Sequence, residues 1–313
     1  MRFALAAVAL LVACAPASPS VSPATTVARA AGWRRVADIP TPRSEVAAAV
    51  FRGVVYIVGG FGGGNIVETY VPDRWTAAPR YPISVDHAMA AGVDTAGTPG
   101  LYVFGGNVSG VAVARSFRFF GDQGWREIAP MPAPRSQAAA AAIGGRIFIV
   151  GGAQGDRLFS PTFVYDTATD RWATAAPIPT PRDHLAVAVI DGRVCAVGGR
   201  KLSLLQNLAI FECYDPATDA WRSMPDAPTA RGGIGAASIG SRLFVTGGEQ
   251  PLGTFKDVDI FDASTGKWTR GPELPTSRHG LGVVAVAGTL YVMSGGPSPG
   301  VSQTPVCEAL DVR

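Results

Sequence analysis

The sequence has few charged residues and very few lysines. Charged residues make up 16% of the 313-residue chain, and the formal net charge is +3. Three of the 27 basic residues are lysines, namely Lys201, Lys256 and Lys267. So weak and dispersed a charge does not predict a polyanionic partner. We therefore expect no nucleic-acid binding.

Helical patterning is also missing. No segment combines a sustained 3.6-residue apolar repeat with helix caps, which argues against a helical fold. The chain instead contains 38 glycines and 25 prolines and is 47% hydrophobic. Such a composition favours many short strands, joined by turns, around a large core. The sequence predicts an all-β fold.

The apolar run near the start of the chain is short. Residues 3–13 form a run of 11, too short to span a bilayer but typical of an export signal. Its end, Leu11-Val12-Ala13-Cys14, resembles the lipobox of bacterial lipoproteins, in which the cysteine is lipidated. We predict a signal peptide over residues 1–14 and a lipid anchor at Cys14, which two or more acyl chains would hold at a membrane. An ordinary cleaved signal, giving a secreted or periplasmic protein, is the alternative.

A second segment separates this signal from the globular part. Residues 15–32 are small, rich in proline, serine and alanine, and nearly uncharged, so we interpret them as a flexible tether. The globular domain is predicted over residues 33–313. Ala15 stands where inner-membrane retention is associated with aspartate, which favours the outer membrane, facing the periplasm.

The globular part is a sixfold repeat. Six short β-branched and aromatic runs each end in a glycine pair, and successive pairs lie 46 to 49 residues apart. The pairs are Gly59-Gly60, Gly105-Gly106, Gly151-Gly152, Gly198-Gly199, Gly247-Gly248 and Gly295-Gly296. A fixed period of this length indicates a repeat architecture.

Each repeat has the composition of a four-stranded antiparallel sheet. The third repeat shows it best, with a small-residue strand at 138–145, a second strand at 146–150, a third at 162–166 and a fourth from Trp172. Small side chains suit strands that crowd around an axis, and tight-turn residues join the other strands. Such sheets bury their faces only against one another, which predicts a six-bladed β-propeller.

The two ends of the domain complete each other. After Gly295-Gly296 the chain supplies one more strand, residues 304–312, and stops before any tryptophan, whereas every other repeat ends in a tryptophan strand. The missing strand stands at the start of the domain, at 33–43. We expect this N-terminal strand to pair into the C-terminal blade and close the ring.

These features resemble the Kelch-repeat family of six-bladed β-propellers. The resemblance rests on the glycine pair, the aromatic-Asp turns such as Tyr165-Asp166 and Tyr214-Asp215, the tryptophan about seven residues on and the Pro-Arg that follows, and it covers residues 33–313. It implies that partners bind on the face formed by the loops that join strands two and three and the loops that join successive blades. The second repeat departs most, because it lacks the arginine and has an insertion at 94–100.

Comparing the repeats distinguishes two sets of equivalent positions on that face, which we call registers. An arginine recurs in five of six repeats, which favours a brace that donates to backbone carbonyls. Two residues later the type varies, which is typical of a binding site at the mouth of the axial channel. The predicted binding residues of both registers and of the loops are Arg43, Glu45, His87, Gln137, Arg182, His184, Asn107, Arg157 and Arg200.

Catalysis and metal binding are predicted only as alternatives. Glu45 and His87, from adjacent blades, could form an acid–base pair, although an ordinary polar rim explains them as well. His87 and His184 are expected to lie far apart across the ring without a carboxylate partner, so we predict no metal site, no cofactor and no catalytic residue.

Three cysteines remain after Cys14. Cys195 and Cys213 fall on neighbouring strands of one blade and could bridge in an oxidising compartment, or could be two buried thiols. Cys307 has no evident partner.

The leading hypothesis is therefore a non-catalytic, envelope-tethered, monomeric binding module that presents its loop face to a protein or glycan ligand. The alternative is an enzyme acting on carbohydrate. The Kelch-like propellers that the sequence resembles include sialic acid epimerases and copper-dependent galactose oxidases. A Glu45–His87 pair could serve an epimerase, whereas the lack of a cysteine on this face disfavours an oxidase. A third hypothesis is a structural envelope protein without a small-molecule ligand.

Overall fold

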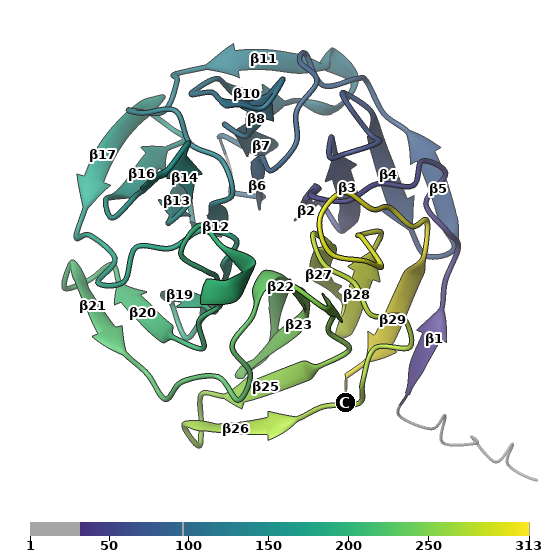
Figure 1. Cartoon of the computed structure of the whole chain (residues 1–313). Coiled ribbons are helices and arrows are strands. Elements are labelled where there is room, and N and C mark those ends of the chain that lie inside the picture. Colours follow the sequence, from purple (N-terminus) through teal and green to yellow (C-terminus); the bar gives the residue numbers. More distant parts are fainter. Residues whose placement is uncertain (1–31, 96, 313) are drawn as a thin grey trace, which may run out of the picture. The chain divides into compact units, whose positions relative to one another are not determined.

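The computed structural model describes residues 32–95 and 97–312. Its main strands form six four-stranded antiparallel sheets, arranged as blades in a ring around an axis (Figure 1). From the axis outward, blade one consists of β2 (Ala47–Phe51), β3 (Val54–Val58), β4 (Val67–Val71) and β5 (Arg74–Ala77). Blade two consists of β6 (Met89–Val93), β7 (Gly100–Phe104), β10 (Ser116–Phe119) and β11 (Trp125–Ile128). Blade three consists of β12 (Ala139–Ile143), β13 (Arg146–Val150), β16 (Thr162–Asp166) and β17 (Arg171–Ala175).

Blades four to six follow the same order. Blade four consists of β18 (Ala186–Ile190), β19 (Arg193–Val197), β20 (Phe211–Asp215) and β21 (Ala220–Ser223). Blade five consists of β22 (Gly232–Ile239), β23 (Arg242–Gln250), β25 (Val258–Asp262) and β26 (Lys267–Arg270). Blade six consists of β27 (Gly282–Val286), β28 (Thr289–Met293), β29 (Cys307–Asp311) and β1 (Trp33–Arg35). Strand β1 pairs with β29 in the register Trp33↔Leu310, so the N-terminal strand completes the last blade (Figure 1). The predicted six-bladed fold and its closure are confirmed.

The connections between the second and third strands carry small elements of their own. Two of them form hairpins, β8 (Asn107–Val108) with β9 (Val111–Ala112) and β14 (Ala153–Gln154) with β15 (Arg157–Leu158). The short strand β24 (Gly253–Thr254) pairs with β23. The 3-10 turn η2 (Leu204–Gln206) lies in the same connection of blade four, whereas η1 (Gly121–Gln123) lies between the third and fourth strands of blade two.

The small residues of the inner strands are required by the crowding at the axis. Each inner strand contacts the inner strands of both neighbouring blades. At Gly92 in β6, an added Cβ would lie 1.8 Å from the backbone oxygen of Val50 in β2. No side chain can occupy such a gap, so glycine at this position lets the two backbones approach.

Two circles of hydrogen bonds join the blades. In blade one, Gly60 of the glycine pair donates its N–H to the backbone oxygen of Val85 in blade two at 2.8 Å, and the equivalent bond recurs at every blade boundary. At the outer rim each tryptophan donates its indole N–H to a carbonyl of the preceding blade, as Trp172 does to Ala129 at 3.0 Å. Trp33 closes this outer circle by donating to Pro272 at 2.8 Å. The tryptophans therefore fasten blades to one another as well as filling space between them.

The cysteines of the described residues lie within blades. Cys195 of β19 and Cys213 of β20 are cross-strand partners, and their sulfurs form a disulfide. Cys307 is a buried free thiol. Among the residues that the structure describes, no helix is long and apolar enough to cross a membrane. The predicted signal peptide with its lipidation site at Cys14 lies outside the described residues, as does the predicted tether over residues 15–32 except for its last residue.

Candidate functional site: a charged ring at the axial mouth

Six residues, one per blade, begin the inner strands at one end of the axis. All six have a left-handed backbone, with φ between 51° and 68°. We call them the mouth register: Glu45, His87, Gln137, His184, Gly233 and Gly280. Four of them carry a side chain in a conformation that disfavours it by about 1 kcal/mol per residue. Local strain of this kind concentrates at functional sites.

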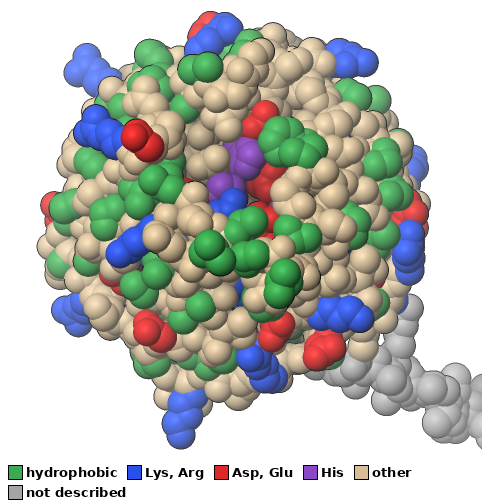
Figure 2. Space-filling view, viewed as in Figure 1, with side chains coloured by type: hydrophobic (Ala, Val, Ile, Leu, Met, Phe, Trp, Pro, Cys, Tyr) green, Lys and Arg blue, Asp and Glu red, His purple; other side chains and the backbone are tan. Residues whose placement is uncertain are grey.

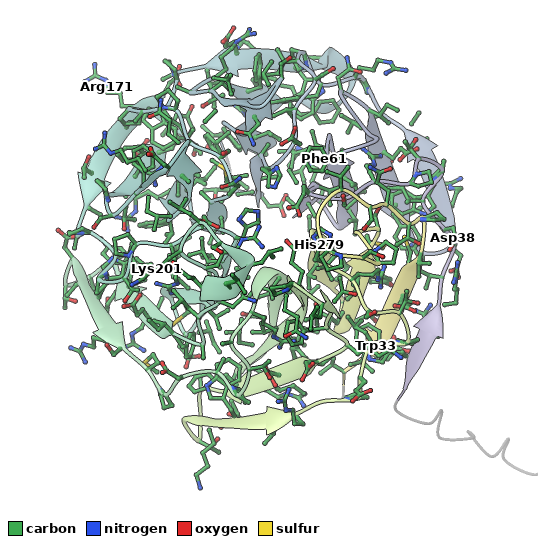
Figure 3. The ribbon with its side chains drawn as sticks, in the orientation of Figure 1. Trp33, Asp38, Phe61, Arg171, Lys201 and His279 are labelled. Carbon is green, nitrogen blue, oxygen red and sulfur yellow. A yellow bond between two sulfur atoms is a disulfide. The ribbon has the colours of Figure 1, made fainter. Side chains whose placement is uncertain are left out.

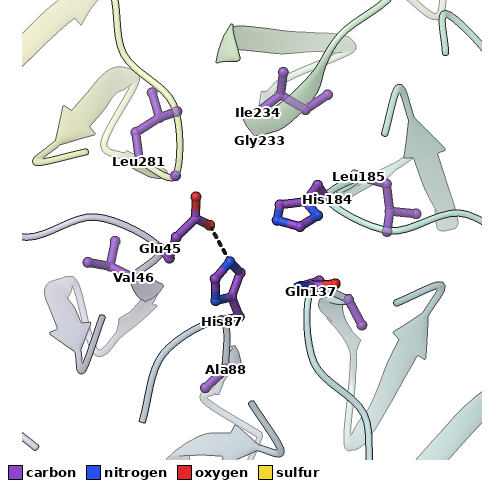
Figure 4. Close-up of a pocket in the computed structure, with 12 residues that line it drawn as sticks. Glu45, Val46, His87, Ala88, Gln137, His184, Leu185, Gly233, Ile234 and Leu281 are labelled. Atoms are coloured by element: carbon purple, nitrogen blue, oxygen red, sulfur yellow. Dashed lines mark ion pairs between the residues drawn. The ribbon is translucent and has the colours of Figure 1, made fainter. Parts of the chain in front are cut away.

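The mouth register is held by a circle of backbone hydrogen bonds. The N–H of His87 donates to the backbone oxygen of Glu45 at 3.0 Å, and the N–H of His184 donates to that of Gln137 at 2.8 Å. The same bond joins each following pair as far as Gly280, and Val46 donates back to Gly280 at 3.4 Å. The backbone around the mouth is thus fixed, and Figure 4 shows the four side chains converging above it.

The two glycines of the mouth register make room for their neighbours. A Cβ on Gly280 would lie 2.5 Å from a carboxylate oxygen of Glu45. A Cβ on Gly233 would meet the side chains of His279 and Glu249 at 3.3 to 3.4 Å. Glycine in blades five and six therefore lets Glu45 and His279 lean across the opening.

Glu45 is the central anion of the mouth. Its Oε2 lies 3.2 Å from Nε2 of His87 (Figure 4). Its Oε1 lies 3.0 Å from Nδ1 of His279, which is labelled in Figure 3. The Glu45 side chain is 9% exposed. Burial opposes its ionisation, but the attraction of His87 and the hydrogen bond of His279 outweigh burial and lower the pKa of Glu45. Glu45 is therefore a carboxylate at neutral pH.

His87 and His184 are held in the same way by the residue that precedes each of them. Nδ1 of His87 lies 2.6 Å from Oδ1 of Asp86, and Nδ1 of His184 lies 2.6 Å from Oδ1 of Asp183. Burial lowers the pKa of His87, but Glu45 and Asp86 outweigh burial and raise it. For His184 burial dominates and lowers the pKa. The environment therefore favours the charged form of His87 and the neutral form of His184.

His279 is also a cation. Its Nδ1 faces Oε1 of Glu45, and its Nε2 lies 3.0 Å from the backbone oxygen of Ser298. Both partners can only accept, so both ring nitrogens must carry protons. Burial lowers the pKa of His279, but the hydrogen bond and charge of Glu45 outweigh it and raise the pKa.

The remaining charged groups continue this network around the opening. His279 Nδ1 lies 3.6 Å from Glu249, which accepts from Nη1 of Arg200 at 2.8 Å. Nε of Arg200 lies 3.4 Å from Asp183, the partner of His184. The network returns to Glu45 through His87, whose ring centroid is 5.2 Å from that of His184. Figure 2 shows this mixture of histidine, acidic and basic side chains at the bottom of a central hollow.

Three cavities adjoin the network. The mouth register and the residues that follow it line a cavity of about 90 Å³. Beneath it, the small inner-strand residues line a channel of about 140 Å³. Beside it, a cavity of about 370 Å³ is lined by Gln137, His184, Asp156, Arg200 and Leu202. The mouth can therefore receive one small polar group, with further space towards blades three and four.

Two of the four predicted binding arginines are unavailable to a ligand. Arg43 and Arg182 are both 0% exposed, so the prediction that they contact a ligand is wrong. Nη1 of Arg43 donates to the backbone oxygens of Gly59 and Ile66. Nε of Arg182 donates to Gly198 at 2.7 Å. These arginines hold the blade from inside.

The other predicted residues are divided between the mouth and the loops. Asn107 donates to Oδ1 of Asp86 at 3.2 Å, so it supports His87 from behind. Arg200 lies within the charged network. Arg157 is exposed on β15 and stacks over the ring of Phe159, away from the network.

The prediction of no metal site rested on the expectation that His87 and His184 lie far apart without a carboxylate partner, and this expectation is also wrong. His87 begins blade two and His184 begins blade four, yet their ring centroids are 5.2 Å apart, and Glu45 supplies a carboxylate. Two groups of three could hold an ion, namely Glu45 with His87 and His184, and Glu45 with His279 and Glu249.

Sequence reasoning missed the acidic residues Asp183 and Glu249 as parts of the site. A signal for the first was present, because the pair Asp-His occurs twice, at Asp86-His87 and Asp183-His184, in the same register.

Comparisons with known proteins agree with the fold. The KLHDC2/KLHL20/DRC7 Kelch-repeats domain matches residues 76–227, and the Kelch motif matches residues 230–275. Kelch-like protein terF of Aspergillus terreus is 28% identical over 145 residues, which cover 44% of this chain and 22% of that protein. Beta-scruin of Limulus polyphemus is 32% identical over 149 residues, which cover 42% of this chain and 16% of that protein.

The matched segments thus span less than a quarter of these curated relatives. A solved structure, that of YjhT, superposes with a TM-score of 0.74 at 17% identity and covers 88% of this chain and 95% of that one, which shows a shared fold. Together with the six closed blades, these matches show that the chain belongs to the Kelch-repeat family of β-propellers.

Proposed function

We propose that this protein is a binding module of the cell envelope that docks a protein partner on its loop face. The observation that carries the proposal is the position of its exposed apolar side chains. Of the described residues, five large hydrophobic ones are strongly exposed, by 44% to 97%. All lie in connections between second and third strands, on the same face as the mouth: Val111, Leu202, Leu205, Leu252 and Val301.

The common face follows from the bridges between loops. Ser44 pairs with Phe61 in blade one and Asp183 pairs with Arg200 in blade four, and each bridge joins a loop between blades to a loop between the second and third strands. The apolar residues therefore surround the charged mouth. Exposed apolar side chains gathered on one face mark protein-binding surfaces, and a polar centre gives such a surface its specificity.

The size of the mouth limits what enters it. A cavity of about 90 Å³ admits one side chain or a comparable terminal group and excludes a folded segment. The apolar loops would supply contact area, while Glu45, Arg200 and their partners would orient a polar group of the partner. Kelch-repeat propellers generally serve as scaffolds for protein interaction, which supports this assignment.

Export to the envelope is supported by two features. Residues 1–14 have the pattern of a lipoprotein signal ending at Cys14. The disulfide between Cys195 and Cys213 is the chemistry of an oxidising compartment. Cell fractionation tests this part, because Cys14→Ser should move the protein from the membrane to the soluble fraction. Retention of that variant at the membrane would refute the lipid anchor.

The docking face is tested by cross-linking the full-length protein in its native envelope. The double variant Leu205→Glu, Leu252→Glu should lose its cross-linked species, while Thr218→Glu, an exposed turn position at the other end of the blades, should keep them. If the cross-linked species persisted in the double variant and disappeared in the Thr218→Glu control, the loop face would be refuted as the docking surface.

A second candidate function is favoured by one contact. The Glu45–His87 pair, 3.2 Å apart, could move a proton on a small polar substrate at the mouth. The purified domain should then turn over sialic acids or galactosides, with or without copper, and Glu45→Gln should abolish that turnover. Absence of turnover across such a panel removes this candidate and leaves the docking proposal intact.

A further inference from the structure

We propose that Glu45, His87 and His184 form a binding site for a divalent transition-metal ion at the axial mouth. The three side chains come from blades one, two and four, and one ligand atom from each lies within 4.8 Å of the others. An ion placed among them would need only small side-chain shifts to reach the usual 2.0 to 2.2 Å for nitrogen and oxygen ligands, about the lengths found around zinc. This inference does not depend on the partner proposed above.

Both histidines already have the orientation that a metal ligand needs. In metal sites, one ring nitrogen binds the ion and the other donates to a carboxylate or carbonyl. Here the Nδ1 atoms of His87 and His184 are 2.6 Å from Asp86 and Asp183 respectively. The Nε2 atoms are the ones left for the ion.

The two aspartates are themselves held in place. Asp86 accepts from Nδ2 of Asn107 at 3.2 Å, and Asp183 accepts from the backbone N–H of Leu202 at 2.8 Å. The same outer arrangement therefore occurs twice, in blades that are not neighbours. A polar rim without a ligand has no need of two Asp–His pairs whose imidazoles meet at one point.

Glu45 is held from its far side. His279 occupies its Oε1 at 3.0 Å, and Oε2 faces Nε2 of His87 at 3.2 Å. A bound ion would take the place of this direct contact between Oε2 of Glu45 and Nε2 of His87. The ring of His184 lies beside that of His87, with the ring centroids 5.2 Å apart.

The second group of three is a poorer site. His279 spends its Nε2 on the backbone oxygen of Ser298 and its Nδ1 on Glu45. Glu249 is already paired with Arg200 at 2.8 Å. Neither ring nitrogen of His279 is free for an ion, so these residues support Glu45 rather than bind the metal.

The ligand set indicates the class of ion. Two imidazoles and one carboxylate suit Zn²⁺, and also Co²⁺, Ni²⁺ or Fe²⁺, whereas Ca²⁺ and Mg²⁺ require more oxygen ligands. Three protein ligands leave a fourth position open towards the cavity of about 90 Å³. A water molecule or a group of a ligand could occupy it.

The test uses untagged full-length protein, freed of metal by chelation. Titration with Zn²⁺ by calorimetry, and with Co²⁺ by visible absorption, should show one ion per chain with nitrogen ligation. His184→Gln should weaken binding at least a hundredfold, because one of three ligands is lost. Asp183→Asn should weaken it ten- to a hundredfold, the range expected when an outer partner of a ligating histidine is removed. Thr218→Ala, an exposed turn position at the other end of the blades, should bind as the wild type does.

Circular dichroism checks that each variant is folded. No saturable binding to the folded wild type would overturn the proposal, as would unchanged affinity in a folded His87→Gln, His184→Gln variant. If His184→Gln fails to fold, the wild-type Co²⁺ spectrum and Asp183→Asn decide, and a spectrum of six-oxygen coordination would refute the site.

Discussion

The arginine register and the mouth register lie two residues apart in each blade, and their side chains are used differently. Arg182 is fully buried and its partners are all within blade four. His184, two residues on, lies at the axis, where it meets His87 of another blade. The first register stabilises each sheet separately, whereas the second gathers side chains from several sheets at one point.

The residue that the register arginine contacts on the third strand differs between blades, and this difference explains the role of the arginine. In blades one, four, five and six the arginine pairs with a buried acid on the third strand, as Arg182 does with Glu212 at 2.5 Å. In blade three this position is Phe163, and Arg135 lies 4.1 Å from the centre of its ring. Blade two has Phe117 there and no arginine. The acid therefore occurs only in blades that have the arginine, and the Arg–acid pair is a structural unit of these four blades.

A threonine belongs to the same unit. Thr180 donates to Oε1 of Glu212 at 2.9 Å, and Thr41 and Thr276 make the equivalent bonds in blades one and six. Blade three, which lacks the acid, has Ala133 at this position.

The largest effect is expected from breaking this unit. Arg182→Met leaves the carboxylate of Glu212 buried without its cation, and the free energy of unfolding should fall by about 3 to 5 kcal/mol. Urea denaturation of the purified domain measures it. The double variant Arg182→Met, Glu212→Leu should recover much of the loss, and a double variant as unstable as the single one would contradict the pairing.

A smaller effect is expected in blade three. Burial, without an acid to oppose it, lowers the pKa of Arg135 to about 9. Arg135→Met removes only the hydrogen bonds to Pro161 and the stacking on Phe159 and Phe163, so it should destabilise by about 1 to 2 kcal/mol. Equal losses for Arg135→Met and Arg182→Met would show that the acid partner contributes little.

A substitution by glycine in the mouth register should raise the free energy of unfolding instead of lowering it. Gln137 has a φ of 57°, and Gln137→Gly removes the conflict between its Cβ and this backbone, so stability should rise by about 1 kcal/mol or slightly less. Gln137→Ala, which keeps the Cβ, is the matched control. A loss of stability in Gln137→Gly relative to this control would mean that the mouth backbone is not strained.

The smallest expected effect is a dependence on pH that belongs to the mouth alone. The raised pKa of His279 means that its pairing with Glu45 contributes fully below the unfolded histidine pKa of about 6.5 and is lost as pH rises through the folded pKa. His87 acts in the same direction. His184, whose pKa is lowered, acts below about pH 6.5 instead, where protonation of the unfolded chain disfavours folding.

Denaturation at several pH values between 6.5 and 9 checks this. Stability should decline across the range in the wild type and less steeply in His279→Gln. An identical slope in both would exclude His279 as the group that titrates.

The sequence predicts the fold because its strongest signals are local and repeated. The glycine pairs recur every 46 to 49 residues, and a strand missing at one end is present at the other. Comparison among repeats also found Glu45, His87, Gln137 and His184 as the mouth. It did not predict how close they are, because the left-handed backbone that turns them towards the axis has no signal in these four residues. Glycine at positions 233 and 280 was the available indication.

The Arg–acid unit was missed for a different reason. The acid stands about 25 to 30 residues after the arginine, on a strand that the pattern identifies only by its aromatic-Asp end. Recurrence of Glu68, Glu212, Asp259 and Glu308 at the second position of that strand could have found it.

The division between the two registers is tested most directly within blade four, by the free energies of unfolding of Arg182→Met and His184→Gly. The account predicts a loss of about 3 to 5 kcal/mol for the first. For the second it predicts a change within about 1 kcal/mol, because relief of a φ of 51° offsets the lost contact with Asp183. If His184→Gly destabilised the domain as much as Arg182→Met, the mouth histidines would serve the fold and not a ligand.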